Sequence, residues 1–137
     1  MRVCLDSNVL VSAFATRGLA ADVLRATLAE HELLVPEVVL VEVRRVLERK
    51  IRLPAATIAA IDQLLRSQTL VPKPPSTLKT PVRDPDDAWV LASAVAGGAD
   101  ILVTGDADLL AAAKDASLPV VSPRSFWERL RGGRRGS

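Results

Sequence analysis

Four acidic residues hold positions from which carboxylates could act together: Asp6, Glu42, Asp87 and Asp106. Asp6 comes directly after a short apolar run at residues 2–5, and Asp106 comes shortly after a second such run at residues 101–104. Both runs are typical of buried strands. Because ligands bind at the carboxyl ends of the strands in open parallel sheets, we expect Asp6 and Asp106 to lie at the same edge of a sheet.

Asp87 and Glu42 lie on predicted helices. Asp87 falls in the first turn of a helix over residues 85–96, one turn before Leu91 on the stripe that must face the sheet. Glu42 lies beside the apolar positions Val39 and Val43 of a helix over residues 36–50. The helical period turns both carboxylates inward, so we expect all four acids to converge.

Converging carboxylates need a cation. At about 4 Å each like-charged pair costs about 4 kcal/mol at an effective dielectric near 20. Ligand sets made only of oxygen select Mg²⁺ or Mn²⁺. Such an ion generates hydroxide from water and neutralises a phosphodiester transition state, and a second ion about 3.5 to 4 Å away stabilises the leaving oxygen. The pattern therefore predicts the chemistry of a nuclease.

Each acid also has a structural interpretation. Asp84 followed by Asp87 resembles a capping box, with Asp86 favoured by the helix dipole, and we expect Asp84 and Asp86 to serve only the helix start. Asp106 could cap the helix that follows, with Asp108 supporting its first turn. Capping therefore competes with metal binding as the reason for these side chains.

Glu42 could instead pair with Arg45 or Arg49 on a solvated helix face. Asp6 is harder to explain structurally, because an acid between two apolar runs at a strand end must be desolvated or given a role. Its neighbour Ser7, and Thr104 beside Asp106, could orient water or a ligand, or only satisfy backbone groups. The sequence favours a surface position over a catalytic role for His31.

Basic residues lie on the approach to Asp87. The proline-rich segment of residues 72–85 must be an extended loop, and it carries Lys73, Lys79 and Arg83. Further arginines stand near the C-terminus: Arg131, Arg134 and Arg135. These side chains either contact the phosphates of a nucleic acid or only keep the surface soluble.

The elements that position these residues are short apolar runs alternating with longer helical segments, as in an α/β fold with a parallel sheet between helices. Strands are expected at residues 2–5, 33–35, 69–71, 101–104 and 119–121. Helices are expected at residues 8–15, capped by Asn8, and at residues 18–30, 36–50, 54–67, 85–96, 107–116 and 123–131. This arrangement predicts a three-layer α/β/α sandwich.

The 137 residues suit a single domain over residues 1–131, followed by a mobile basic tail over residues 132–137. A hydrophobic fraction of 49% with 25% charged residues is globular composition, and the net charge of +2 permits a polyanionic partner without requiring one. Cys4 is the only cysteine, so neither an internal disulfide nor a cysteine-rich metal site can form. With no signal peptide or apolar run of about 18 residues, we expect no membrane span and a cytoplasmic protein.

Four segments resemble the successive motifs of PIN domains, and they follow in order over nearly the whole chain. They are LDSNVLVSA at residues 5–13, the helix of Glu42, RDPDDAWVLASAVAGGAD at residues 83–100 and ILVTGDADLL at residues 101–110. The resemblance maps the family's metal-binding acids onto Asp6, Glu42, Asp87 and Asp106. It maps supporting positions onto Ser7, Asn8 and Thr104, and a secondary acid of variable role onto Asp108.

The resemblance implies binding of Mg²⁺ or Mn²⁺, activation of water for RNA hydrolysis, and a central sheet of four or five parallel strands. The chain is similar to VapC-like toxins of type II toxin-antitoxin pairs. This similarity implies a homodimer and an antitoxin that covers the active site. The TGDxDLL form departs from many VapC toxins, which carry arginine and phenylalanine in this stretch.

Two other functions compete with a nuclease. A haloacid-dehalogenase-type phosphatase also places acids at strand ends, but the run Asp6-Ser7-Asn8 lacks the second aspartate which that chemistry needs. A degenerate PIN fold would act only as a non-catalytic RNA- or protein-binding module. The presence of all four acids argues against the second alternative.

Overall fold

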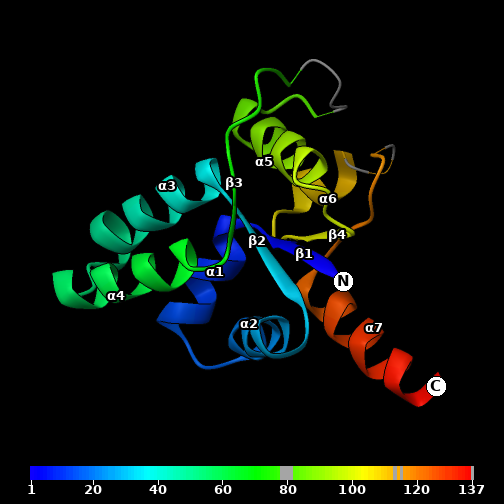
Figure 1. Ribbon diagram of the computed structural model, residues 1–137, viewed down its shortest axis with the longest axis horizontal. Coiled ribbons are helices and arrows are strands. Elements are labelled where there is room, and N and C mark those ends of the chain that lie inside the picture. The colour runs from blue at the N-terminus through cyan, green and yellow to red at the C-terminus, as the bar shows by residue number, and fades with distance from the viewer. Residues whose placement is uncertain (78–81, 113, 115, 137) are drawn as a thin grey trace.

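A parallel sheet runs through the middle of the computed structural model, which describes residues 1–77, 82–112, 114 and 116–136, with side chains described to residue 132 (Figure 1). Its strands are β1 (Arg2–Leu5), β2 (Glu32–Pro36), β3 (Thr69–Val71), β4 (Ile101–Val103) and β5 (Val120–Val121). They lie in the order β3-β2-β1-β4-β5, and every pairing is parallel. The expectation of a parallel sheet with up to five strands is confirmed.

Helices cover both faces of this sheet. They are α1 (Ser7–Ala15), α2 (Leu19–Glu30), α3 (Glu37–Val46), the π-helix η1 (Leu47–Ile51), α4 (Ala55–Arg66), α5 (Pro85–Ala96), α6 (Ala107–Ala112) and α7 (Pro123–Gly136). The chain moves outward from β1 to β3 and then returns past β1 to β4, so right-handed crossovers carry α5 to the opposite face. Figure 1 shows α5 and α6 on one side of the sheet and α2 and α7 on the other. The three-layer prediction is therefore correct.

β1 is the central strand, and its composition explains its place. Val3, Cys4 and Leu5 have no exposed surface, as expected for a parallel strand covered on both faces. Cys4 pairs with Leu34 of β2 on one side and with Leu102 of β4 on the other. The direction of the connections reverses between β1 and β4, and ligands bind at such switch points in open α/β sheets.

The cap of the first helix differs from our expectation. Asp6, and not Asn8, is the N-cap of α1, and its Oδ1 accepts a hydrogen bond of 2.8 Å from the Ser7 amide. Asn8 lies inside the helix, and its side chain is used instead to reach the end of β4. The helix therefore begins directly at the strand end.

The helix expected over residues 36–50 is two elements. After Val46 the α3 helix widens into the π-helix η1, which ends where Arg52 adopts a left-handed conformation with φ of 59°. The Arg52 amide donates to the Leu47 carbonyl, closing the last turn. Sequence rules assign such a stop to glycine or asparagine, and neither residue stands here.

Two later helices also differ in length. α6 ends at Ala112 and not near residue 116, although residues 113 and 115 lie outside the described part of the chain. α7 continues to Gly136, whereas we expected its end near Arg131 and a tail from residue 132. The glycines at positions 132 and 133 do not stop the helix. Within the described residues, no helix is both long and apolar enough to cross a lipid bilayer.

Candidate active site

Asp6 stands at the carboxyl end of β1, and three donors fix its carboxylate. Oδ1 accepts from the Ser7 amide at 2.8 Å, and Oδ2 accepts from Thr104 Oγ1 at 2.7 Å and from Asn8 Nδ2 at 3.1 Å. The side chain is buried, with 4% of its surface exposed. Burial raises the pKa of Asp6, and the charge of Asp106 raises it further, against the lowering effect of the three hydrogen bonds.

Asn8 and Thr104 join the ends of β1 and β4. Asn8 Oδ1 accepts from the Gly105 amide at 2.9 Å, and the Thr104 hydroxyl accepts from the Asp106 amide at 3.0 Å. Thr104 is fully buried. These bonds fix the position of the loop that carries Asp106 relative to Asp6.

Asp106 caps the helix that follows it. Its Oδ1 accepts from the Asp108 amide at 2.8 Å and from the Leu109 amide at 3.1 Å. The capping interpretation is therefore correct for Asp106. It does not exclude a second role, because the side chain also lines the cavity described below.

The first turn of α5 brings in Asp87. The N-cap is Asp84, whose Oδ1 accepts from the amides of Asp86 and Asp87 at 2.9 and 3.2 Å, as the capping interpretation predicts. Burial, followed by the negative charge of Asp106, raises the pKa of Asp87 to about 6, and Asp84 and Asp6 contribute further. Asp87 thus experiences the other acids directly.

The four predicted acids line one cavity of about 530 Å³ at the carboxyl edge of the sheet. They come from four elements: Asp6 from the end of β1, Glu42 from α3, Asp87 from α5 and Asp106 from the end of β4. Three further acids line the same cavity: Asp84, Asp86 and Asp108. Ser7 and Asn8 lie on its wall as well, so all four predicted acids and two of the predicted supporting residues line one cavity.

The structure does not support the interpretation in which Glu42 forms a salt bridge on a solvated helix face. Among the described residues the ion pair on this helix joins Arg44 to Glu48 at 3.0 Å, and Glu42 pairs with neither Arg45 nor Arg49. The carboxylate is half-buried and faces the cavity. Its place beside Val39 and Val43, and not salt bridging, explains its orientation.

The donor set of the cavity suits a hard divalent cation, because every acid in it offers oxygen alone. The raised pKa values of Asp6 and Asp87 have neighbouring carboxylates among their causes, which is the repulsion that a cation would relieve. As the side chains stand, no three acidic groups of the described residues are close enough to hold an ion together. Asp6, Glu42, Asp87 and Asp106 are the residues that could close around one.

The comparisons with known proteins fit this geometry. The family model of the PIN domain matches residues 2–108, which include all four acids. The chain belongs to the PIN-domain family. No protein of curated function matches the sequence.

Solved structures share the fold of this PIN domain. VapBC2 from Rickettsia felis, in a structure bound to a DNA fragment from the promoter, matches with a TM-score of 0.63 and 15% identity over 89% of this chain and 98% of that chain. PAE2754 from Pyrobaculum aerophilum matches with a TM-score of 0.68 and 20% identity over 96% of each chain. At these identities the likeness is one of fold.

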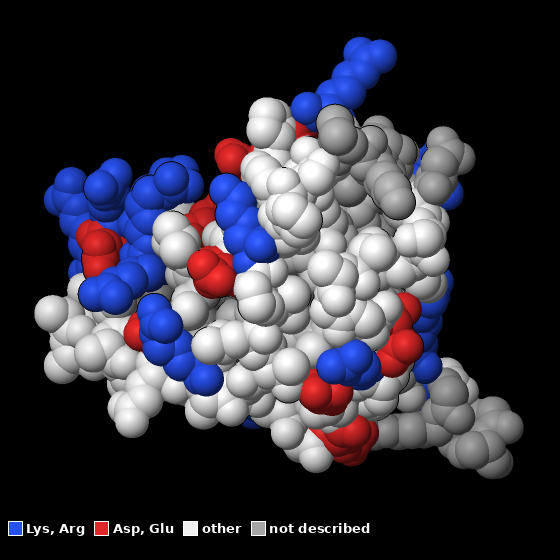
Figure 2. Space-filling model, turned by 45° about the horizontal axis from the view of Figure 1, so that its top comes forward, with Lys and Arg blue, Asp and Glu red and all other residues white. Residues whose placement is uncertain are grey.

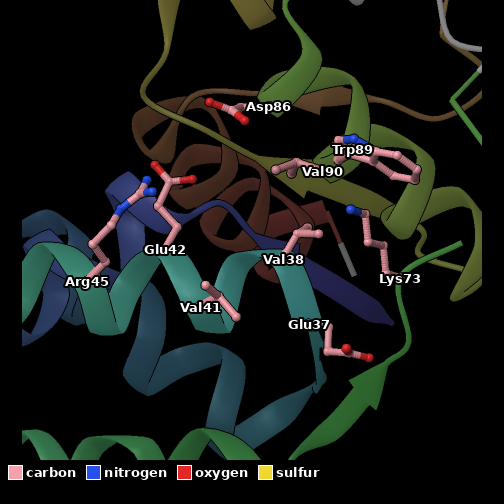
Figure 3. Close-up of a pocket in the computed structure, with 9 residues that line it drawn as sticks. All are labelled: Glu37, Val38, Val41, Glu42, Arg45, Lys73, Asp86, Trp89 and Val90. Carbon is pink, nitrogen blue, oxygen red and sulfur yellow. The ribbon is translucent and has the colours of Figure 1, made fainter.

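A second cavity of about 350 Å³ adjoins the acidic one in this PIN domain, between α3 and α5 (Figure 3). The two cavities share Glu42, Asp86 and Val90. The second is lined in addition by Glu37, Val38, Val41, Arg45, Lys73 and Trp89. Figure 3 shows Asp86 on the α5 side of this cavity, facing Glu42 and Arg45 on α3.

Sequence reasoning missed several residues of these cavities. Asp84 and Asp86 were expected only to serve the start of α5, yet both line the acidic cavity. Lys50 and Arg45 were not expected at the site. Arg45 lies three residues after Glu42 on a helix, which was a usable signal, whereas Lys50 carried none. Trp89 carried no signal in the sequence.

The basic residues of the loop lie in three situations. Lys73 lines the second cavity, with its Nζ 4.2 Å from the centre of the Trp89 ring, a cation–π contact. Arg83 is exposed beside the start of α5, and Lys79 lies outside the described residues.

Arg131 is exposed on α7, whereas the side chains of Arg134 and Arg135 lie outside the described part. His31 ends α2 and lies near the N-terminal amine, outside both cavities.

Proposed function

We propose that this PIN domain is a metal-dependent ribonuclease that hydrolyses RNA phosphodiester bonds. The observation that carries the proposal is the cavity in which acids from β1, α3, α5 and β4 meet. Capping explains Asp6 and Asp106 one at a time. It does not require carboxylates from four separate elements to line the same cavity. Their convergence is favourable only with a cation present.

Asp6, Glu42, Asp87 and Asp106 would hold Mg²⁺ or Mn²⁺. A bound ion of this kind supplies hydroxide from water and neutralises charge on the phosphodiester in the transition state. Thr104, Asn8 and the Ser7 amide hold the Asp6 carboxylate in a fixed orientation, which prepares it as a ligand. Burial and the neighbouring carboxylates raise the pKa of Asp87 to about 6, and a bound cation would favour its ionised form.

We further propose that the ribonuclease is the toxin of a toxin-antitoxin pair, held by a cognate antitoxin in the cytoplasm and assembled as a homodimer. The fold likeness to VapBC2 supports this assignment. Co-expression with the product of a neighbouring reading frame tests it. A stable complex that suppresses RNA cleavage is expected, and free, uninhibited protein would contradict the toxin assignment alone.

The ribonuclease proposal is tested by incubating metal-free protein with mixed RNA in EDTA, in Mg²⁺ and in Mn²⁺. We expect cleavage products only with a divalent ion. Cleavage that persists equally in EDTA would contradict metal dependence. RNA binding without cleavage in any metal would favour the non-catalytic binding module.

A further inference from the structure

The end of α3 and the π-helix η1 carry five cations within nine residues: Arg44, Arg45, Arg49, Lys50 and Arg52. All five side chains are exposed. Figure 2 shows blue side chains gathered over the end of the molecule where α3 and η1 lie, at the left of the view, with acidic side chains beside them. This density of like charge needs an explanation, because it opposes folding.

The protein itself neutralises only part of this charge. Arg44 pairs with Glu48 at 3.0 Å. Among the described residues, the side chains of Arg45, Arg49, Lys50 and Arg52 take part in no ion pair and no hydrogen bond. These four form what we call the α3–η1 basic face, and they remain available to an anion.

Two members of this face reach the cavities. Lys50 lines the acidic cavity, and Arg45 lines the adjoining one. Glu42, a predicted metal ligand, lines both cavities. Lys73 is at the far wall of the second cavity. Cations from the basic face and Lys73 therefore line a path along the two adjoining cavities.

A polyanionic strand fits this path better than an acidic protein does. The acidic cavity repels carboxylates, and it attracts a phosphodiester only through bound metal. Cations outside the cavity can hold phosphates on each side of that point. A nucleic acid backbone can use both features, the basic face for neighbouring phosphates and bound metal for the phosphate that is cleaved, whereas an acidic protein surface can use only the basic face.

We propose that the α3–η1 basic face binds the phosphates of single-stranded RNA next to the cleaved bond, with Arg45 and Lys50 as the two contacts nearest the acids. The proposal rests on the ribonuclease function proposed above. It adds a binding surface on α3 and η1 to the loop residues Lys73, Lys79 and Arg83 that the sequence indicated.

The test compares two double variants with the same loss of charge. Arg45→Gln with Lys50→Gln removes the proposed contacts. Arg44→Gln with Arg66→Gln is the matched control, because both arginines are ion-paired, to Glu48 and to Asp62. Binding of a fluorescently labelled single-stranded RNA is measured by anisotropy in EDTA, which prevents cleavage, over a series of KCl concentrations.

We expect roughly tenfold weaker RNA binding by Arg45→Gln/Lys50→Gln than by wild type. The slope of log affinity against log KCl should fall by about 1.4, since each phosphate contact on a single strand contributes about 0.7. The control should keep the wild-type slope. Equal melting temperatures of the two double variants establish that folding is unchanged, and the two single variants give the same comparison if a double variant misfolds.

Equal slopes for both double variants would overturn the proposed surface, as would a wild-type protein that binds no RNA at low salt. The outcome is separable from that of the proposed function. If the double variant at Arg45 and Lys50 loses salt-dependent binding and the wild type does not cleave RNA in Mn²⁺, the binding surface is supported and the ribonuclease function is contradicted. Cleavage by wild type together with unaltered binding by the variant removes the surface alone.

Discussion

At the scale of single residues, Asp6 and Asp87 have different surroundings. Asp6 is buried but receives three hydrogen bonds from neighbours that the fold fixes. Asp87 is more exposed, and its carboxyl stands among the charges of Asp106, Asp84 and Asp6. Without metal, Asp87 is therefore the acid for which ionisation most directly opposes folding.

This predicts a pH dependence of metal-free stability. The pKa of Asp87 is about 6 in the folded protein and about 3.9 in an unfolded chain, so the folded state binds the proton more tightly. The contribution of Asp87 to the free energy of unfolding must then fall as pH rises from about 4 to above 6. Asp87→Asn lacks this ionisation.

Urea unfolding in EDTA at about pH 4.5 and about pH 7.5 measures the effect. The stability of Asp87→Asn relative to wild type should rise between the two pH values. Asp6 titrates in both proteins and largely cancels in the comparison. A constant difference would show that the pKa of Asp87 is not raised in the folded protein, against its burial beside the other carboxylates.

The sequence predicted the acids well and the cations poorly, for physical reasons. Asp6 and Asp106 follow apolar strands, and the ends of parallel strands meet at one edge whatever the strand order. The direction of the Lys50 side chain depends on the π-helical turn of η1, which no pattern in the sequence predicts. Asp86 was assigned to the helix start alone, because the spacing to Leu91 turned Asp87 toward the sheet and gave no such signal for Asp86.

At the scale of elements, the α3–η1 unit departs most from the sequence-based expectation. The apolar stripe of Val39, Val43 and Leu47 predicted one long helix, and these side chains are indeed buried. The same stripe is compatible with a wider last turn, since only Leu47 of that turn is buried. Helix length could be predicted from the stripe, but the π-helical turn could not.

A prediction about this element concerns Arg52, which has a φ of 59°. A left-handed conformation costs an L-residue roughly 1–2 kcal/mol, and glycine avoids that cost while losing about 0.5–1 kcal/mol of chain entropy. Arg52→Gly should therefore raise the free energy of unfolding by up to about 1 kcal/mol. Arg52→Ala is the control, because alanine keeps the left-handed cost.

Chemical denaturation of both variants measures the difference. Equal stability of Arg52→Gly and Arg52→Ala would mean that the left-handed residue imposes no strain on the end of η1. The comparison between the two variants removes the effect of losing the arginine charge. It therefore reports on the backbone alone.

At the scale of the whole molecule, the order β3-β2-β1-β4-β5 brings together acids that lie 19 to 100 positions apart in the chain. The sequence predicted the parallel sheet and its layers. The strand order could not be predicted from the sequence, because it depends on how the helices pack on the two faces of the sheet. The proposed metal site would thus be a property of the assembled sheet and should be absent from the unfolded chain.

Binding to the folded state alone predicts stabilisation by metal. Mn²⁺ at about 100 times its Kd should add about 2.7 kcal/mol to the free energy of unfolding. Thermal melts in EDTA and in millimolar Mn²⁺ measure the shift. A melting temperature that does not change with Mn²⁺ would contradict a metal site in the folded protein.

The most direct test of the central claim is the rate of RNA cleavage by Asp6→Asn in Mn²⁺. Asparagine keeps the shape of Asp6 but removes the charge that ligation needs, so we expect the single-turnover rate to fall at least about a hundredfold with the fold intact. Asp100→Asn is the matched control, because Asp100 accepts a hydrogen bond from the Arg2 amide at the opposite end of β1. The control should cleave at the wild-type rate and keep the stabilisation by Mn²⁺. Cleavage by Asp6→Asn at the wild-type rate would contradict the assignment of this cavity as the active site.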